Sequence, residues 1–132
     1  MKKILILFFA LSLGLVACNK DDDDADTQNT NNQLNPPTWI QGTWMAENAT
    51  LATGYQFTED DMLSIIGESS VSLMNSLSGS AYTINENTTS TSYQFSIHYT
   101  ELDSTESWEF NLMDDTHLQA VHGTTTETLT KQ

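Results

Sequence analysis

The sequence predicts an all-β fold, a small antiparallel up-and-down barrel of about eight strands with one short helix. Three observations predict it. Apolar and polar residues alternate over most of residues 38–132, which is typical of strands with one buried face. Turn-forming residues separate these runs at hairpin distances. Many short strands in a chain of 132 residues favour closure, because a closed sheet has no exposed edge.

The strands follow one another along the whole domain. The clearest alternation is that of Tyr93, Phe95 and Ile97 with polar neighbours, and Trp108 and Phe110 repeat it. The expected strands lie near residues 42–51, 54–58, 62–66, 81–86, 91–101, 106–113, 116–122 and 125–131.

One segment, residues 68–78, departs from this period. Its apolar residues recur at steps of three and four, which favours a short helix. Ser69 or Ser70 would cap the helix, and Gly79 would end it. A serine-rich loop fits the same segment, because serine is only a middling helix former.

The N-terminal residues 1–17 are expected to be a signal peptide. Lys2 and Lys3 precede an apolar run from Ile4 to Val16. A helix that spans a bilayer needs about 20 residues, so this run is too short for an anchor and suits an export signal.

Cys18 is the expected lipidation site. Leu15-Val16-Ala17-Cys18 resembles the lipobox of bacterial lipoproteins, in which lipid is attached to the cysteine and the chain is cut before it. The resemblance implies a membrane anchor through lipid on Cys18. Cys18 is also the one cysteine of the chain, so no internal disulfide is expected.

An acidic segment follows Cys18. Residues 18–37 are therefore expected to comprise the lipidated cysteine and a disordered tether after it. Lys20 and the aspartates 21–24 resemble the surface-export signal of Bacteroidetes lipoproteins. The resemblance implies a location at the outer membrane, where the domain would face either the cell exterior or the periplasm. The acidic run also suits a tether extended by charge repulsion. Apolar residues are scarce before Pro36 and Pro37, which predicts disorder and a domain over 38–132.

The domain begins with Gly42-Thr43-Trp44. This motif resembles the start of the first strand in the lipocalin family, and the layout of the domain resembles that of small lipocalin-like lipoproteins. The resemblance implies that Gly42 and Trp44 are structural, with Trp44 at the closed end of the barrel. It also implies a basic residue near the chain end over this tryptophan. The chain has no arginine, so Lys131 is the candidate.

The sequence contains no recognisable set of catalytic residues. We therefore expect no enzyme activity, no cofactor and no metal site. His98, His117 and His122 are the only histidines, and the last two are expected on opposite faces of one strand. No Gly-x-Ser-x-Gly motif or glycine-rich phosphate loop is present. A formal charge of −14 argues against a nucleic-acid partner.

Two functions remain. Inward aromatic residues would line a pocket for a small apolar molecule, or else fill the core: Tyr55, Phe57, Tyr93, Phe95, Tyr99, Trp108 and Phe110. The alternative is an inhibitor- or immunity-type interaction with a basic protein, because residues 38–132 carry 13 acidic residues and Lys131 as the one Lys or Arg.

Ser104 is a candidate for modification. Asp103-Ser104-Thr105 resembles the O-glycosylation sequon of exported Bacteroidetes proteins. The same residues also suit a hairpin turn.

Overall fold

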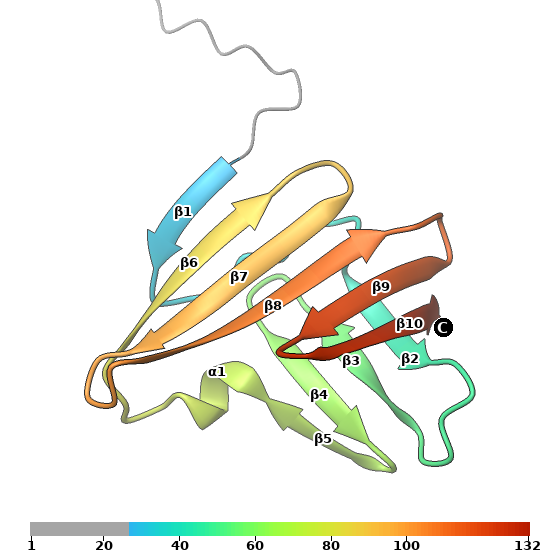
Figure 1. The fold of residues 1–132 in the computed structure, drawn as a ribbon, viewed down its shortest axis with the longest axis horizontal. Helices are drawn as coiled ribbons and strands as arrows, with labels where there is room; N and C mark the ends of the chain where they lie inside the picture. The colour runs from blue at the N-terminus through green and yellow to red at the C-terminus, as the bar shows by residue number, and fades with distance from the viewer. Residues whose placement is uncertain (1–26) are drawn as a thin grey trace, which may run out of the picture.

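The computed structural model describes residues 27–132. The chain forms an antiparallel, all-β fold with one short helix, which confirms the predicted fold class (Figure 1). The strands are β1 (Thr27–Asn31), β2 (Gly42–Ala46), β3 (Thr53–Phe57), β4 (Met62–Ile66), β5 (Ser69–Ser72), β6 (Tyr82–Thr88), β7 (Ser92–Tyr99), β8 (Ser104–Leu112), β9 (His117–His122) and β10 (Thr125–Lys131), and the helix is α1 (Leu73–Ser76). The predicted signal peptide, Cys18 and the acidic run as far as residue 26 lie outside the described residues.

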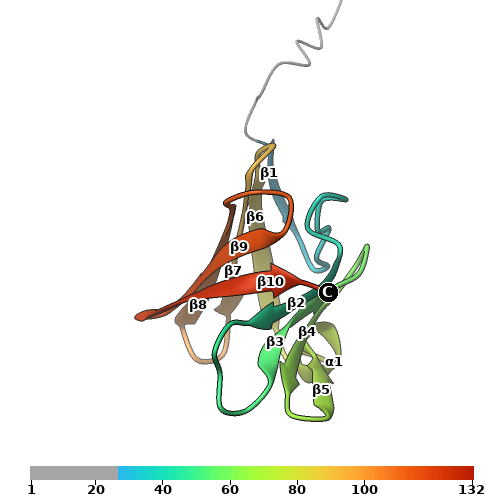
Figure 2. The same ribbon diagram turned by 90° about the vertical axis from the view of Figure 1, so that its right-hand side faces the viewer.

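One curled sheet contains all ten strands, in the order β1-β6-β7-β8-β9-β10-β2-β3-β4-β5. From β2 to β10 each strand pairs with the next, except that β5 and β6 do not pair. The pairing of β10 with β2, with Lys131 opposite Trp44, brings the two ends of this meander together. The result is a half-barrel whose two sides face each other across the core and whose opening lies between the outermost strands, β5 and β1 (Figure 2).

The segment 32–41 and α1 lie at this opening. Leu34 and Ile40 are completely buried, and the backbone N–H of Asn35 donates to Glu86 on β6. On the other side, residues 32 and 33 line a small hollow together with the β3–β4 turn and α1. The segment therefore bridges the two margins of the open sheet.

The prediction of a disordered tether up to residue 37 is wrong for residues 27–37. β1 pairs with β6 over five residue pairs, from Thr27–Thr88 to Asn31–Ile84, and Leu34 enters the core. An edge strand is held by backbone hydrogen bonds, so β1 needs no apolar pattern of its own. The folded domain therefore begins before residue 38.

The predicted helix over 68–78 is reduced to a single turn. Residues 69–72 form β5 instead, paired with β4, and Val71 is 56 % exposed. The helical spacing fails because Val71 does not share a buried face with Leu77. Ser72 caps α1 by accepting a hydrogen bond from the N–H of Asn75.

The turns largely follow the sequence. Asp103 and Gly123 have positive φ angles of 45° and 59° in two tight hairpins, as turn residues of these types do. β2 is shorter than predicted, because Asn48, at φ 58°, turns the chain soon after Ala46. Among residues 27–132, no helix has the length and apolar character needed to cross a membrane.

Candidate functional site

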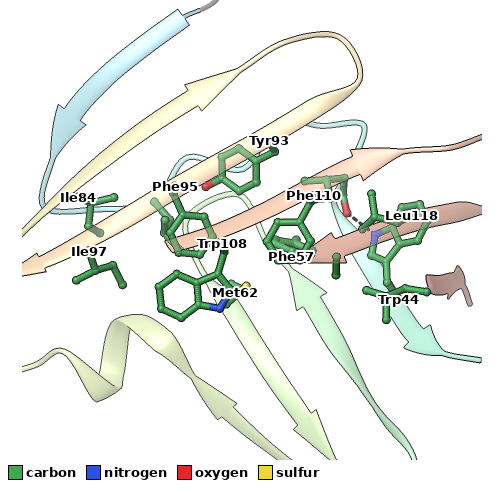
Figure 3. Packing of buried hydrophobic residues seen from close by; sticks show 14 of the residues in the cluster. Trp44, Phe57, Met62, Ile84, Tyr93, Phe95, Ile97, Trp108, Phe110 and Leu118 are labelled. Atoms are coloured by element: carbon green, nitrogen blue, oxygen red, sulfur yellow. Dashed lines mark hydrogen bonds between the residues drawn. The ribbon is translucent and has the colours of Figure 1, made fainter. Parts of the chain in front are cut away.

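The inward aromatic residues pack against one another inside the half-barrel (Figure 3). Phe57 meets Phe110 edge to face at 4.9 Å between ring centres, and Phe95 stacks on Trp108 at the same separation. Such contacts add to the stabilisation from burial alone. The rings thus occupy the space in which an interior ligand would have to lie.

Seven aromatic residues were predicted to face inward, and the structure brings six of them into this network. Phe57, Tyr93, Phe95, Trp108 and Phe110 are buried. The remaining two are partly exposed. Tyr55 meets the edge of Phe110 at 5.4 Å, whereas Tyr99 lies at the margin with its hydroxyl 3.5 Å from Glu106.

A buried carboxylate, Glu86, links the core to the N-terminal segment. Its side chain accepts hydrogen bonds from the Tyr93 hydroxyl at 2.6 Å and from the backbone and side-chain nitrogens of Asn35. Burial and the adjacent Glu86 carboxylate raise the pKa of Tyr93, so this hydroxyl stays a donor. Sequence reasoning missed Glu86. The sequence pattern did indicate its burial, because Glu86 comes two residues after the buried Ile84 and so lies on the same face of β6.

A hollow of about 630 Å³ lies over β7, β8 and β9. Its lining residues include Gln94, Ser96, Thr105, Ser107, Glu109 and Val121. Phe95 and Trp108 also border it, but they are only 2 % and 7 % exposed. The hollow therefore meets little of their side chains.

The strand register assigns this hollow to the outer face of the sheet. Ser96 pairs with Ser107, and Glu109 pairs with both Gln94 and Val121. Paired residues share a face, and successive residues alternate between faces. These five residues are each adjacent in sequence to the inward positions 95, 108, 110, 120 or 122, so they point away from the core. Most residues that line the hollow therefore lie on the outer face, whereas Phe95, Glu106, Trp108 and His122 border it from the inner face.

The three histidines do not converge. His122 stacks on Trp108 at 4.5 Å between ring centres, and His98 contacts the hydroxyl of Thr105. Within residues 27–132, no three His, Cys, Asp or Glu side chains are grouped to hold a metal ion.

His117 lies between two carboxylates on the surface. Its Nδ1 is 2.8 Å from Asp114 Oδ1, and its Nε2 is 3.4 Å from Glu47 Oε1. The hydrogen bond to Asp114 raises the pKa of His117. The Thr116 backbone N–H, together with His117, lowers the pKa of Asp114 to about 2.

The Gly-x-Trp motif is structural in its contacts. Trp44 is completely buried, and its Nε1 donates to the carbonyl of Ile40 at 2.7 Å. Gly42 has φ 117°, and a Cβ at this position would lie 3.5 Å from Lys131 Cε. The motif therefore holds β2 against the end of β10.

Ser104 begins β8 and is exposed. The Asp103 side chain, which precedes it, is 98 % exposed at the hairpin. The position is thus accessible from solvent, and the turn expected from the same residues is present.

Comparison with known proteins gives no match: neither a protein-family profile, nor a curated protein, nor a solved structure is similar to this chain.

Proposed function

We propose that this chain is a non-enzymatic lipoprotein of the bacterial outer membrane, whose acidic domain binds a basic protein. The observation that carries the proposal is the filled interior. Six of the seven predicted pocket residues contact one another through their rings. Small barrels packed in this way offer no room for a ligand.

Charge supports a protein partner. All but one of the 13 acidic residues in 38–132 escape burial, the exception being Glu86. Lys131 is the single Lys or Arg of that range. Such a surface attracts a cationic partner over long range and accelerates its association. The anchor rests on the sequence around Cys18, and it would hold the domain at the membrane with its surface free.

Binding of a small apolar molecule is the alternative. The hollow of about 630 Å³ favours it by size, since small-molecule sites measure about 300–1,000 Å³. Most of the residues that line it are polar and face outward, which favours a polar partner instead.

Two measurements separate these functions. For the apolar ligand, tryptophan fluorescence of the full protein is titrated with N-phenylnaphthylamine and palmitate. We expect no saturable change. Saturable quenching that Phe95→Trp abolishes would establish a pocket at Trp108 and overturn the filled-interior argument.

For the protein partner, photo-crosslinking groups are placed on the outer face, at Gln94 and Val121, in cells that produce the chain. We expect one basic protein to crosslink reproducibly. The purified pair should then bind with an affinity that falls as salt rises. A purified partner that does not bind, or binds independently of salt, would contradict the proposal.

A further inference from the structure

We propose that the outer hollow and the adjoining free edge of β8 bind an extended, basic segment of the partner by strand addition. This inference rests on the proposed function and names its site. In strand addition, backbone hydrogen bonds hold a peptide against an exposed sheet edge, and pockets receive alternate side chains.

The free edge arises because β8 is longer than its neighbour. β8 pairs with β7 along its first four residues, from Ser104 opposite Tyr99 onward. Its pairing with β9 begins only at Trp108, opposite His122. All four residues from 104 to 107 are exposed. Within the described part of the chain, no strand covers this edge.

The backbone groups that face outward along this edge can be assigned. Leu112 donates its N–H toward β7, to Thr91, whereas Met113 donates toward β9, to His117. Successive residues of a strand alternate in this direction. The register of β8 is uninterrupted, so Thr105 and Ser107 direct their N–H and C=O groups to the free edge.

The hollow lies beside these same residues. Thr105, Ser107 and Glu109 line it from the outer face, and Glu106, whose partner Ile97 is buried, lines it from the inner face. Neither glutamate has a cationic partner, since Lys131, the one Lys or Arg among the described residues, lies over Trp44. A strand added at the edge would point alternate side chains toward this acidic hollow, and arginine suits it because its planar head pairs with carboxylates.

The test uses the full protein and an acetylated peptide in which arginine and threonine alternate. We expect salt-dependent binding, measured by calorimetry, and protection of residues 104–107 from hydrogen exchange. Ser107→Pro removes an edge N–H that does not bond to β7 and should weaken binding about tenfold, as the loss of a backbone hydrogen bond does. Glu109→Gln should weaken it by about threefold, whereas Glu59→Gln, a matched loss of charge outside the hollow, should leave it unchanged.

Proline can disturb folding, so the same bond is also removed from the peptide. Two peptides are compared, one methylated on the backbone nitrogens of the odd positions and the other on those of the even positions. One of them should lose binding, because its methyl groups face the edge of β8, and the other should keep it. Equal binding by both methylated peptides, or protection of β5 at residues 69–72 instead, would overturn the site.

The outcomes also separate this site from the proposed function. If the crosslinked partner binds equally well to wild type, Ser107→Pro and Glu109→Gln, the edge proposal fails and the function stands. If neither the arginine–threonine peptide nor any basic envelope protein binds, both fail.

Discussion

Lys131 places its ammonium group 5.0 Å from the centre of the Trp44 ring, directly across the β10–β2 pairing. The lipocalin resemblance led us to expect a basic residue in this position, and Lys131 occupies it. The contact fastens the last strand onto the first strand of the meander. It therefore stabilises the pairing that brings the two ends of the half-barrel together.

Lys131→Met should lower the free energy of unfolding by about 0.5–1 kcal/mol, because it removes an exposed cation from the Trp44 ring and keeps the aliphatic length. Urea denaturation measures this change. Lys131→Arg restores the charge and should recover most of the loss. Equal stability of all three proteins would mean that the contact contributes nothing.

Trp44→Ala should cost about 3–5 kcal/mol of unfolding free energy, as truncation of a large buried aromatic does. Trp44→Phe keeps much of the ring but leaves the Ile40 carbonyl without its donor, so we expect a smaller loss. Thermal and urea unfolding measure the loss of stability in both variants. If Trp44→Ala is nearly neutral, the Gly-x-Trp motif is a chance match and the lipocalin interpretation fails.

Alternation predicted the central strands well because their inner faces are buried. Phe95 and Ile97 alternate with half-buried neighbours along β7, as the sequence pattern requires. β1 and β5 escaped prediction for the opposite reason. They are the outermost strands of the sheet, held by backbone pairing, and Val71 on β5 points to solvent.

The candidate site could not be predicted from the sequence for a related reason. The hollow depends on the cross-strand pair Ser96–Ser107 and on the different lengths of β8 and β9. Neither the register nor a strand end can be read from composition. The alternation predicted six of the seven inward aromatic residues, all but Tyr99. Whether these rings fill the core or line a pocket depends on packing, which the sequence pattern does not give.

Removing residues 27–37 should destabilise the domain. Leu34 is completely buried, and a Leu→Ala change at such a site costs about 2–5 kcal/mol. We expect a chain that starts at residue 38 to unfold at clearly lower urea than one that starts at residue 27, and Leu34→Ala to reproduce part of the loss. Equal midpoints would show that this segment only rests on the core.

Cys18→Ser should leave an unlipidated precursor that keeps residues 1–17. The reason is that a hydroxyl does not replace the thiol in lipid transfer, and the cut before Cys18 depends on the lipid. Mass spectrometry of the mature N-terminus and detergent partitioning measure this outcome. If Cys18→Ser is cleaved normally and still partitions into detergent, lipid anchoring at this position is refuted.

Stability should depend on pH through His117 and Asp114. The pKa of His117 is raised by its hydrogen bond with Asp114, so its contribution is fully present below about pH 6.5 and is lost as the pH rises through the folded value. The pKa of Asp114 is lowered to about 2, so its contribution is lost as the pH falls from about 4 toward 2. The urea midpoint of wild type should therefore fall at both ends relative to His117→Gln and Asp114→Asn. The two variants should also lose their dependence on pH above 6.5 together, because each removes one side of the same hydrogen bond. A wild-type midpoint that runs parallel to both variants over the whole range would show that the pair makes no net contribution to folding.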